Sequence, residues 1–155
     1  MAASEYAFSE KTLINILDAI DEGIFLIGLD ETVLEANNAV LSLHNVSRDE
    51  YIGRPLEYFV DPQDRQRFRE NVQLVLSKET IRDQIKALRR DRSTFPAELT
   101  LSLLRDDSGK PLAIVGIIQD RTQRIRVQQQ IEKTTTELTA LMKRSTEIIR
   151  TTDLH

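Results

Sequence analysis

The tightest constraint on the fold of this chain is the place where an apolar strand runs directly into a long helix. Residues 113–118 are apolar or glycine, and Asp120-Arg121-Thr122 follows shortly after them with no turn signal between. From Thr122 to about Arg150 there is no proline or glycine, and apolar or small residues recur at alternating steps of four and three. This period of about 3.5 residues is typical of a coiled coil. The order predicts a folded domain that passes a mechanical change into a paired helix, and it does not suit an active site.

Composition limits the class of protein. With 155 residues, 40% of them hydrophobic and 30% charged, the chain is expected to form one globular domain with an appendage. It has no cysteine, which excludes disulfides, thiolate metal sites and cysteine nucleophiles and agrees with the cytoplasmic location that we expect. The net charge of -4 argues against a nucleic-acid partner, and we interpret Arg89, Arg90 and Arg92 as an exposed hairpin tip. No apolar run is long enough for a membrane segment, and the first residues do not form a secretory signal.

An amphipathic helix is predicted near the N-terminus. Residues 9–20 carry apolar side chains at helical spacing, including Leu13 and Leu17 on one face. Ser9 is expected to cap this helix, and Gly23 is expected to end it.

A hairpin and several short helices are predicted next. Residues 24–29 and 32–36 are short apolar runs separated by polar residues, which favours two antiparallel strands. Asn37 or Asn38 then caps a short helix, and Ser47–Glu50 has the pattern of a capping box. A capping aspartate followed by proline at residues 61–62 predicts a longer helix that runs to about residue 77. The side chains expected to face inward from that helix are Phe68, Val72, Val75 and Leu76.

Three further strands are predicted at residues 80–90, 94–105 and 111–119. The last of them is apolar on both faces, so it needs cover on both. We expect the short helices to cover one face and the helix at residues 9–20, from the same chain or a partner, to cover the other. The order predicts an α+β fold: a five-stranded antiparallel sheet with short helices on one face, an N-terminal helix and a long C-terminal helix.

Several of these segments together resemble a known family. The resembling residues are the opening strand Gly23–Ile27, the segment Glu35–Ala39, the turn Tyr51–Pro55, the helix start Asp61-Pro62 and the junction Asp120–Thr122. In this order and spacing, over roughly residues 10–122, the chain resembles a PAS domain. The resemblance implies a sensory module that binds a cofactor or small molecule between sheet and helices, or merely dimerises, and that controls an attached effector.

The same resemblance argues against two familiar cofactors. Flavin-binding light-oxygen-voltage domains carry a reactive cysteine where this chain has Leu56, and polar flavin contacts where it has Ala87, Ala97 and Ile118. Unpaired polar edges of a buried flavin would cost about 1–3 kcal/mol each. Haem-binding PAS domains supply a histidine from the long helix, and residues 61–77 contain none. Cysteinyl-flavin and haem are therefore disfavoured, and the cofactor is left unassigned.

A candidate ligand cavity is predicted at the inner face of the sheet. Small residues that face helices leave room for an apolar ligand, but they equally allow close packing, and the packed core is the favoured alternative. The candidate cavity residues are Leu56, Phe59, Val72, Ala87, Ala97, Leu99, Gly116 and Ile118.

No catalytic or metal-binding constellation is recognised in the sequence, so we expect no enzyme activity and no metal site. His44 is the only histidine inside the predicted domain. It would serve as a metal ligand or a pH sensor, but a histidine at a helix C-terminus, satisfied by carbonyl groups, is the favoured interpretation.

The junction and the terminal helix complete the prediction. Asp120 and Thr122 are the candidate signal junction, with Thr122 expected to cap the helix. The residues expected at the interface of a parallel homodimer are Leu13, Leu17, Val127, Ile131, Leu138, Leu141 and Ile148, and Met142 with Ile149 makes a second register conceivable. A helix that folds back on its own domain is the alternative.

The predicted organisation has three parts. Residues 1–22 form the N-terminal helix, residues 23–120 the PAS domain, and residues 121–155 a coiled-coil linker towards a downstream effector such as a histidine kinase, nucleotide cyclase or phosphatase. We expect the chain to be a fragment or truncated sensor, or else a stand-alone dimerising protein. The competing function is a ligand-free PAS interaction module.

Overall fold

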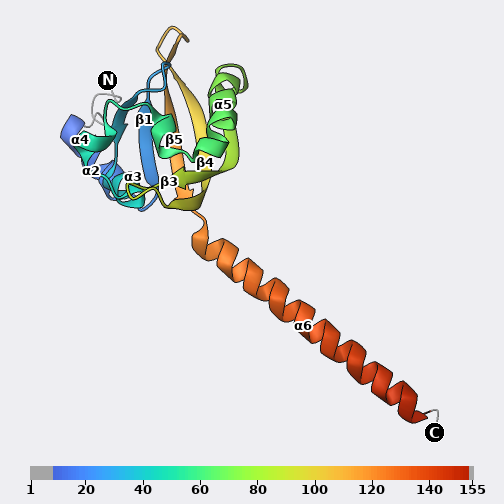
Figure 1. Cartoon of the computed structure of the whole chain (residues 1–155). Helices are drawn as coiled ribbons and strands as arrows, with labels where there is room; N and C mark the ends of the chain where they lie inside the picture. Colours follow the sequence, from blue (N-terminus) through green and yellow to red (C-terminus); the bar gives the residue numbers. More distant parts are fainter. Residues whose placement is uncertain (1–8, 154–155) are drawn as a thin grey trace, which may run out of the picture. The chain divides into compact units, whose positions relative to one another are not determined.

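A five-stranded antiparallel sheet forms the centre of the domain in the computed structural model (Figure 1). The structure describes residues 9–153, apart from the side chains of residues 10, 13 and 150–153. The strands lie in the order β2-β1-β5-β4-β3, so β5 is the central strand. Their bounds are β1 Gly23–Ile27, β2 Val33–Ala36, β3 Thr80–Leu88, β4 Thr94–Arg105 and β5 Pro111–Asp120. The predicted α+β fold class is confirmed.

Short helices connect β2 to β3 and cover one face of the sheet. They are α3 (Asn38–His44), α4 (Arg48–Tyr51), the 3-10 turns η1 (Leu56–Phe59) and η2 (Pro62–Asp64), and α5 (Arg65–Lys78). Asn37 caps α3 by accepting a hydrogen bond from the Val40 amide, and the capping box at Ser47 and Glu50 is present. Asp61 and Pro62 begin a 3-10 turn rather than α5 itself.

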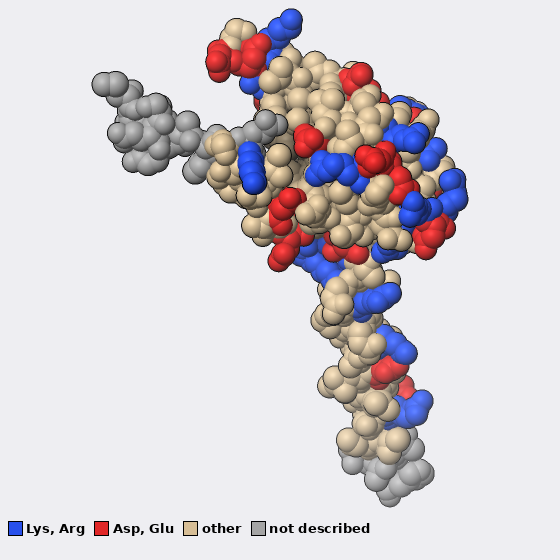
Figure 2. All heavy atoms as spheres, turned by 90° about the vertical axis from the view of Figure 1, so that its left-hand side faces the viewer, with Lys and Arg blue, Asp and Glu red and all other residues tan. Residues whose placement is uncertain are grey.

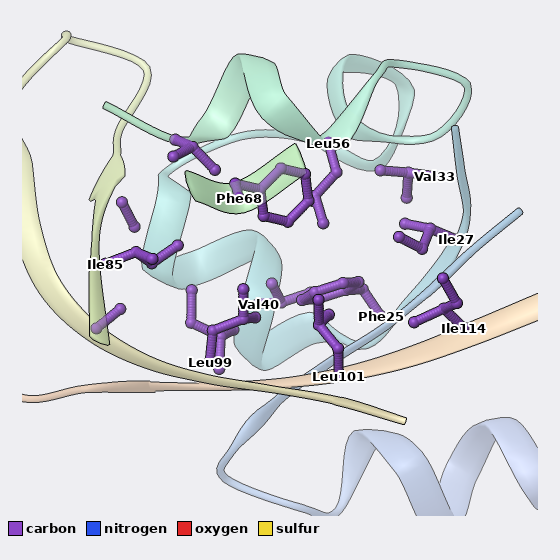
Figure 3. Packing of buried hydrophobic residues seen from close by; sticks show 14 of the residues in the cluster. Phe25, Ile27, Val33, Val40, Leu56, Phe68, Ile85, Leu99, Leu101 and Ile114 are labelled. Atoms are coloured by element: carbon purple, nitrogen blue, oxygen red, sulfur yellow. The ribbon is translucent and has the colours of Figure 1, made fainter. Parts of the chain in front are cut away.

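Buried apolar side chains from sheet and helices form one core between the two layers (Figure 3). Every second residue of β4, from Phe95 to Leu103, points into this core. The helix α5 contributes three of its four predicted core residues, whereas Leu76 is 38% exposed. The prediction for Leu76 is wrong because its neighbour Val75 takes the buried position and adjacent helix residues point about 100° apart.

The N-terminal helix α2 (Glu10–Asp18) begins after Ser9, whose side chain accepts a hydrogen bond from the Thr12 amide as expected. It ends at Asp18 and not at Gly23, which instead begins β1. Two of its side chains, Ile14 and Leu17, line a groove together with outward-facing residues of the sheet. The helix thus partly covers the face that the other helices leave open (Figure 3).

One buried amide holds the end of α2, the start of β1 and the start of α3 together. Asn37 is 2% exposed. Its Oδ1 accepts hydrogen bonds from the amides of Ile24 at 2.9 Å and Val40 at 3.1 Å. Its Nδ2 donates to the carbonyls of Leu17 at 3.1 Å and Glu22 at 2.9 Å. The side chain therefore uses its full hydrogen-bonding capacity.

The long helix α6 (Thr122–Asp153) spans 32 residues and belongs to a second compact unit, which starts after Asp120. Its first helical residue is Thr122, so the cap position falls on Arg121, one residue earlier than predicted. The Arg121 carbonyl accepts a hydrogen bond from the Ile125 amide at 2.9 Å. Among the residues that the structure describes, no helix is long and apolar enough to cross a membrane.

Candidate functional site: the inner sheet face and the strand–helix junction

The eight predicted cavity residues all lie at the inner side of the sheet or on the helices that face it. Seven are buried, and Phe59 is partly buried and packs against the core. Four of them line a small residual cavity: Leu56, Phe59, Leu99 and Ile118. The cavity is completed by Phe25, His44, Tyr51, Val60, Phe68 and Ile85.

This residual cavity measures only about 10 Å³, roughly the space for one water molecule. The room that Gly116 leaves is taken by a side chain from the neighbouring strand. A Cβ atom at Gly116 would lie 2.1 Å from Cζ of Phe25, far inside van der Waals contact. Gly116 and Phe25 are register partners in β5 and β1, so the glycine accommodates the ring. The small residue therefore serves packing in this conformation.

A buried histidine lies beside this cavity at the C-terminal end of α3. His44 is 2% exposed. Its Nδ1 lies 2.7 Å from the carbonyl oxygen of Leu88 in β3. Its ring centroid is 5.3 Å from that of Phe59 and 5.6 Å from those of Tyr51 and Phe95. A carbonyl group does satisfy this histidine, but the carbonyl comes from a strand and not from its own helix.

Tyr51 contributes a polar group with no evident structural use. The ring is fully buried and its centroid lies 4.6 Å from that of Phe59. Its hydroxyl has no hydrogen-bond partner within the described part of the chain. Burial raises the pKa of this hydroxyl, so it stays protonated. A donor next to an apolar cavity is the kind of group that orients a ligand.

His44 makes the stability of the domain depend on pH. Burial lowers its pKa below the ordinary value of 6.5, the hydrogen bond to Leu88 opposes this, and the charge of Arg89 acts with burial. In the unfolded chain the imidazole regains its ordinary pKa and binds more protons than in the folded chain. The free energy of unfolding is therefore expected to fall as pH drops below about 6.5, by at most about 1.4 kcal/mol per pH unit.

Urea denaturation between about pH 7.5 and pH 5.5 measures this slope. The control is His44→Gln, because the carboxylate titrations are common to both proteins and cancel in the comparison. Wild type should lose more stability than the variant over this range. Parallel pH curves would contradict the assignment.

Arg89 connects this buried cluster to the predicted junction. Its guanidinium carbon lies 4.6 Å from the ring centroid of Phe95. The same guanidinium forms an ion pair with Asp120 at 3.9 Å. A chain of contacts therefore runs from His44 through Phe95 and Arg89 to the last residue of β5. Arg90 and Arg92 are exposed at the hairpin between β3 and β4, as expected. Arg89 lies in the same hairpin but is partly buried, because its side chain packs on Phe95 of β4 and reaches Asp120 of β5.

Six of the seven predicted interface residues have exposed side chains in the single chain. Leu17 on α2 is 38% exposed and lines an apolar groove of about 280 Å³ with Ile24, Leu26 and Val115. The side chain of Leu13 lies outside the described residues. On α6 the exposures are Val127 50%, Ile131 54%, Leu138 56%, Leu141 57% and Ile148 60%.

Charged side chains of both signs alternate on the face shown in Figure 2. On α5, Arg67 pairs with Asp83 of β3, and Arg69 with Glu57 of η1, each at 2.9 Å. In the described part of the chain, no cluster of three or more histidine, aspartate or glutamate side chains is arranged to hold a metal ion.

The strand order and the closed core beneath the short helices define a small α+β domain of the PAS fold class. The PAS fold family model matches residues 17–126. The chain therefore belongs to the PAS family, as its motifs suggested. No curated protein is similar enough to the chain to count as a relative.

Solved structures agree on the fold. The PAS domain of a protein from Colwellia psychrerythraea is 18% identical, with a TM-score of 0.68, and the match covers 73% of this chain and 97% of that one. A domain of a sensory box sensor histidine kinase/response regulator from Geobacter sulfurreducens is 21% identical, with a TM-score of 0.61 and coverage of 71% and 92%. An RNA-binding light-oxygen-voltage receptor is 22% identical, with a TM-score of 0.67, and the match covers 84% of this chain but 37% of the receptor.

Proposed function

We propose that this chain is the sensory and dimerisation module of a signal-transduction protein. A ligand or partner changes the packing at the inner sheet face, and β5 moves. The movement passes through Asp120 and Thr122 into α6. The helix α6 pairs with α6 of a second copy and leads to an effector domain. The observation that carries this proposal is the continuity of β5 and α6. The strand contributes Ile114 and Ile118 to the core, and only Arg121 separates it from the helix.

The contacts of Asp120 support a role for the junction. The ion pair to Arg89 ties the end of β5 to a side chain that also packs on Phe95, at the edge of the buried cluster. A rearrangement of that cluster moves the guanidinium group of Arg89 and so alters its ion pair with Asp120. In this proposal the ligand cavity is formed by the eight residues from Leu56 to Ile118 named above, with the hydroxyl of Tyr51 as an added polar group.

The second candidate function is a ligand-free PAS module that dimerises and senses no small molecule. The residual cavity of about 10 Å³ favours it, because a larger ligand enters only if core side chains move. Native mass spectrometry and visible absorbance of the purified protein separate the two. A co-purifying small molecule favours sensing, and a colourless, ligand-free dimer favours the interaction module.

Transmission is tested by a matched pair of core variants. Ile118 and Ile85 line the same cavity and are 3% and 4% exposed. Ile118 is on β5, which leads to α6, whereas Ile85 is on the edge strand β3. Replacing either by valine should cost about 1 kcal/mol of stability and leave the domain folded.

Pulsed electron paramagnetic resonance on a nitroxide at Gln129→Cys reads the separation of the two α6 helices. We expect Ile118→Val to shift the distance distribution and Ile85→Val to leave it unchanged, and Asp120→Ala to remove the shift. If both valine variants behave alike, β5 is not the route of transmission.

A further inference from the structure

The apolar face of α6 is wider than one coiled-coil seam requires. A central stripe, spaced by seven residues, contains Ile131, Leu138 and Ser145. It is flanked by two further stripes with the same spacing. The first stripe contains Val127, Thr134, Leu141 and Ile148, and the second stripe contains Gln128, Thr135, Met142 and Ile149. All of these side chains are exposed in the single chain.

Either flanking stripe completes a heptad seam with the central stripe. From Val127 the steps to Ile131 and then Thr134 are four and three, and from Gln128 the steps to Ile131 and Thr135 are three and four. Both are the spacings of core positions in a coiled coil. The central residues occupy the a position in the first seam and the d position in the second.

The two flanking stripes are chemically almost the same. Thr134 is followed by Thr135, and Leu141 by Met142. Ile148 is likewise followed by a second isoleucine, so three of the four layers barely change between the seams. Only the layer nearest the junction differs, with valine in the first stripe and glutamine in the second. The two seams are therefore close in energy, and Val127 favours the first.

The partner that best fits this face is α6 of a second copy, paired in parallel and in register. Both seams contain polar layers at Ser145 and at a threonine, flanked by leucine and isoleucine layers. Parallel pairing in register places each polar layer against its own copy and each apolar layer against an apolar one. A shifted pairing would bury hydroxyl groups against leucine, which costs free energy.

We infer that the paired α6 helices switch between two registers, related by a rotation of each helix through about 50° about its own axis. This inference rests on the proposed dimer. The register change gives the junction a defined action: a rotation of the residues after β5 exchanges Leu141 for Met142 at the dimer axis. The first seam is the resting register, because it buries Val127 in place of Gln128.

The absence of cysteine from the chain makes disulfide trapping a direct test. Residues at a or d meet their own copies at the two-fold axis, whereas residues at e or g do not. Leu141→Cys therefore reports the first register and Met142→Cys the second. Lys143→Cys lies in neither stripe and is the control. Rates of cross-linking under a mild oxidant are compared on the whole chain, with the association state measured by sedimentation.

Both reporters are expected to cross-link at rates well above that of the Lys143→Cys control, and Leu141→Cys is expected to cross-link faster than Met142→Cys. A second pair of variants biases the equilibrium. Thr134→Leu adds an apolar layer to the first seam only and should raise the ratio of Leu141→Cys to Met142→Cys rates about tenfold, whereas Thr135→Leu should lower it by a similar factor.

Each other outcome overturns the inference in a recognisable way. A dimer that cross-links through one reporter only, with the ratio unchanged by either threonine variant, has a single register, and the proposed dimer survives. A tetramer that buries both stripes at once also excludes switching. A monomer without cross-links excludes the proposed coiled coil itself.

Discussion

Replacing Asn37 by alanine is expected to lower the free energy of unfolding by about 3 kcal/mol. The side chain makes four hydrogen bonds to backbone groups of α2, the α2–β1 connection, β1 and α3. Alanine would leave two amides and two carbonyls without these partners in a buried place, and α3 would lose its cap. Chemical denaturation measures the loss, and amide hydrogen exchange should show faster opening of α2.

The neighbouring residue supplies the matched control. Asn38 is exposed. Its backbone amide donates a hydrogen bond to Asp18 Oδ1 at 3.0 Å, and this bond does not involve the side chain of Asn38. Asn38→Ala should therefore change stability by less than about 0.5 kcal/mol. A further variant, Asn37→Asp, retains an acceptor for the two amides but turns a carboxylate oxygen towards the carbonyls of Leu17 and Glu22. It should be destabilising as well. If Asn37→Ala costs no more than Asn38→Ala, the amide does not hold these elements together.

Substituting Gly116 by valine is expected to cost about 3 kcal/mol, because the new side chain would overlap the ring of Phe25. The smaller change Gly116→Ala should cost less, since only one methyl group must be accommodated. Both losses are measured by urea denaturation. Both losses of stability arise from the contact between residue 116 and the ring of Phe25, so a substitution of Phe25 should change their size.

A double-mutant cycle isolates that contact. Phe25→Leu shortens the side chain and should relieve part of the cost of Gly116→Ala, which gives a coupling energy of about 1 kcal/mol or more. Additive losses would mean that the ring moves aside freely. In that case a ligand can occupy the space over Gly116, and the result favours the ligand-sensing function over the ligand-free interaction module.

Much of the fold follows from patterns that are local in the sequence. The alternation of apolar and polar residues in β4 predicts which side faces the core, because successive strand residues point to opposite faces. The capping box at Ser47 and Glu50 satisfies backbone groups within one turn, so it is recognisable without the rest of the chain. The helical character of α6 follows from an uninterrupted sequence of 32 residues without glycine or proline.

The candidate site was less accessible to sequence reasoning. Small residues at Ala87, Ala97 and Gly116 mark an inner face with spare room, but the pattern does not say what fills the room. Arg89 gave no signal of its contact with Asp120, since a basic residue near a turn is usually exposed. The sequence predicts Asn37 as one of two alternative caps. Its hydrogen bonds to the carbonyls of Leu17 and Glu22 have no sequence signature.

The sequence by itself therefore determined the strands, the capping box at Ser47 and Glu50, the core face of β4 and the heptad period of α6, because each depends on residues within a few positions of one another. Only the tertiary structure decided what these elements enclose. His44 bonds a carbonyl 44 residues away, and Phe25 fills the space of Gly116 across two strands. Arg89 likewise meets Asp120 across the sheet. Such contacts depend on the strand order β2-β1-β5-β4-β3, which brings distant segments side by side and which no local pattern of residues encodes.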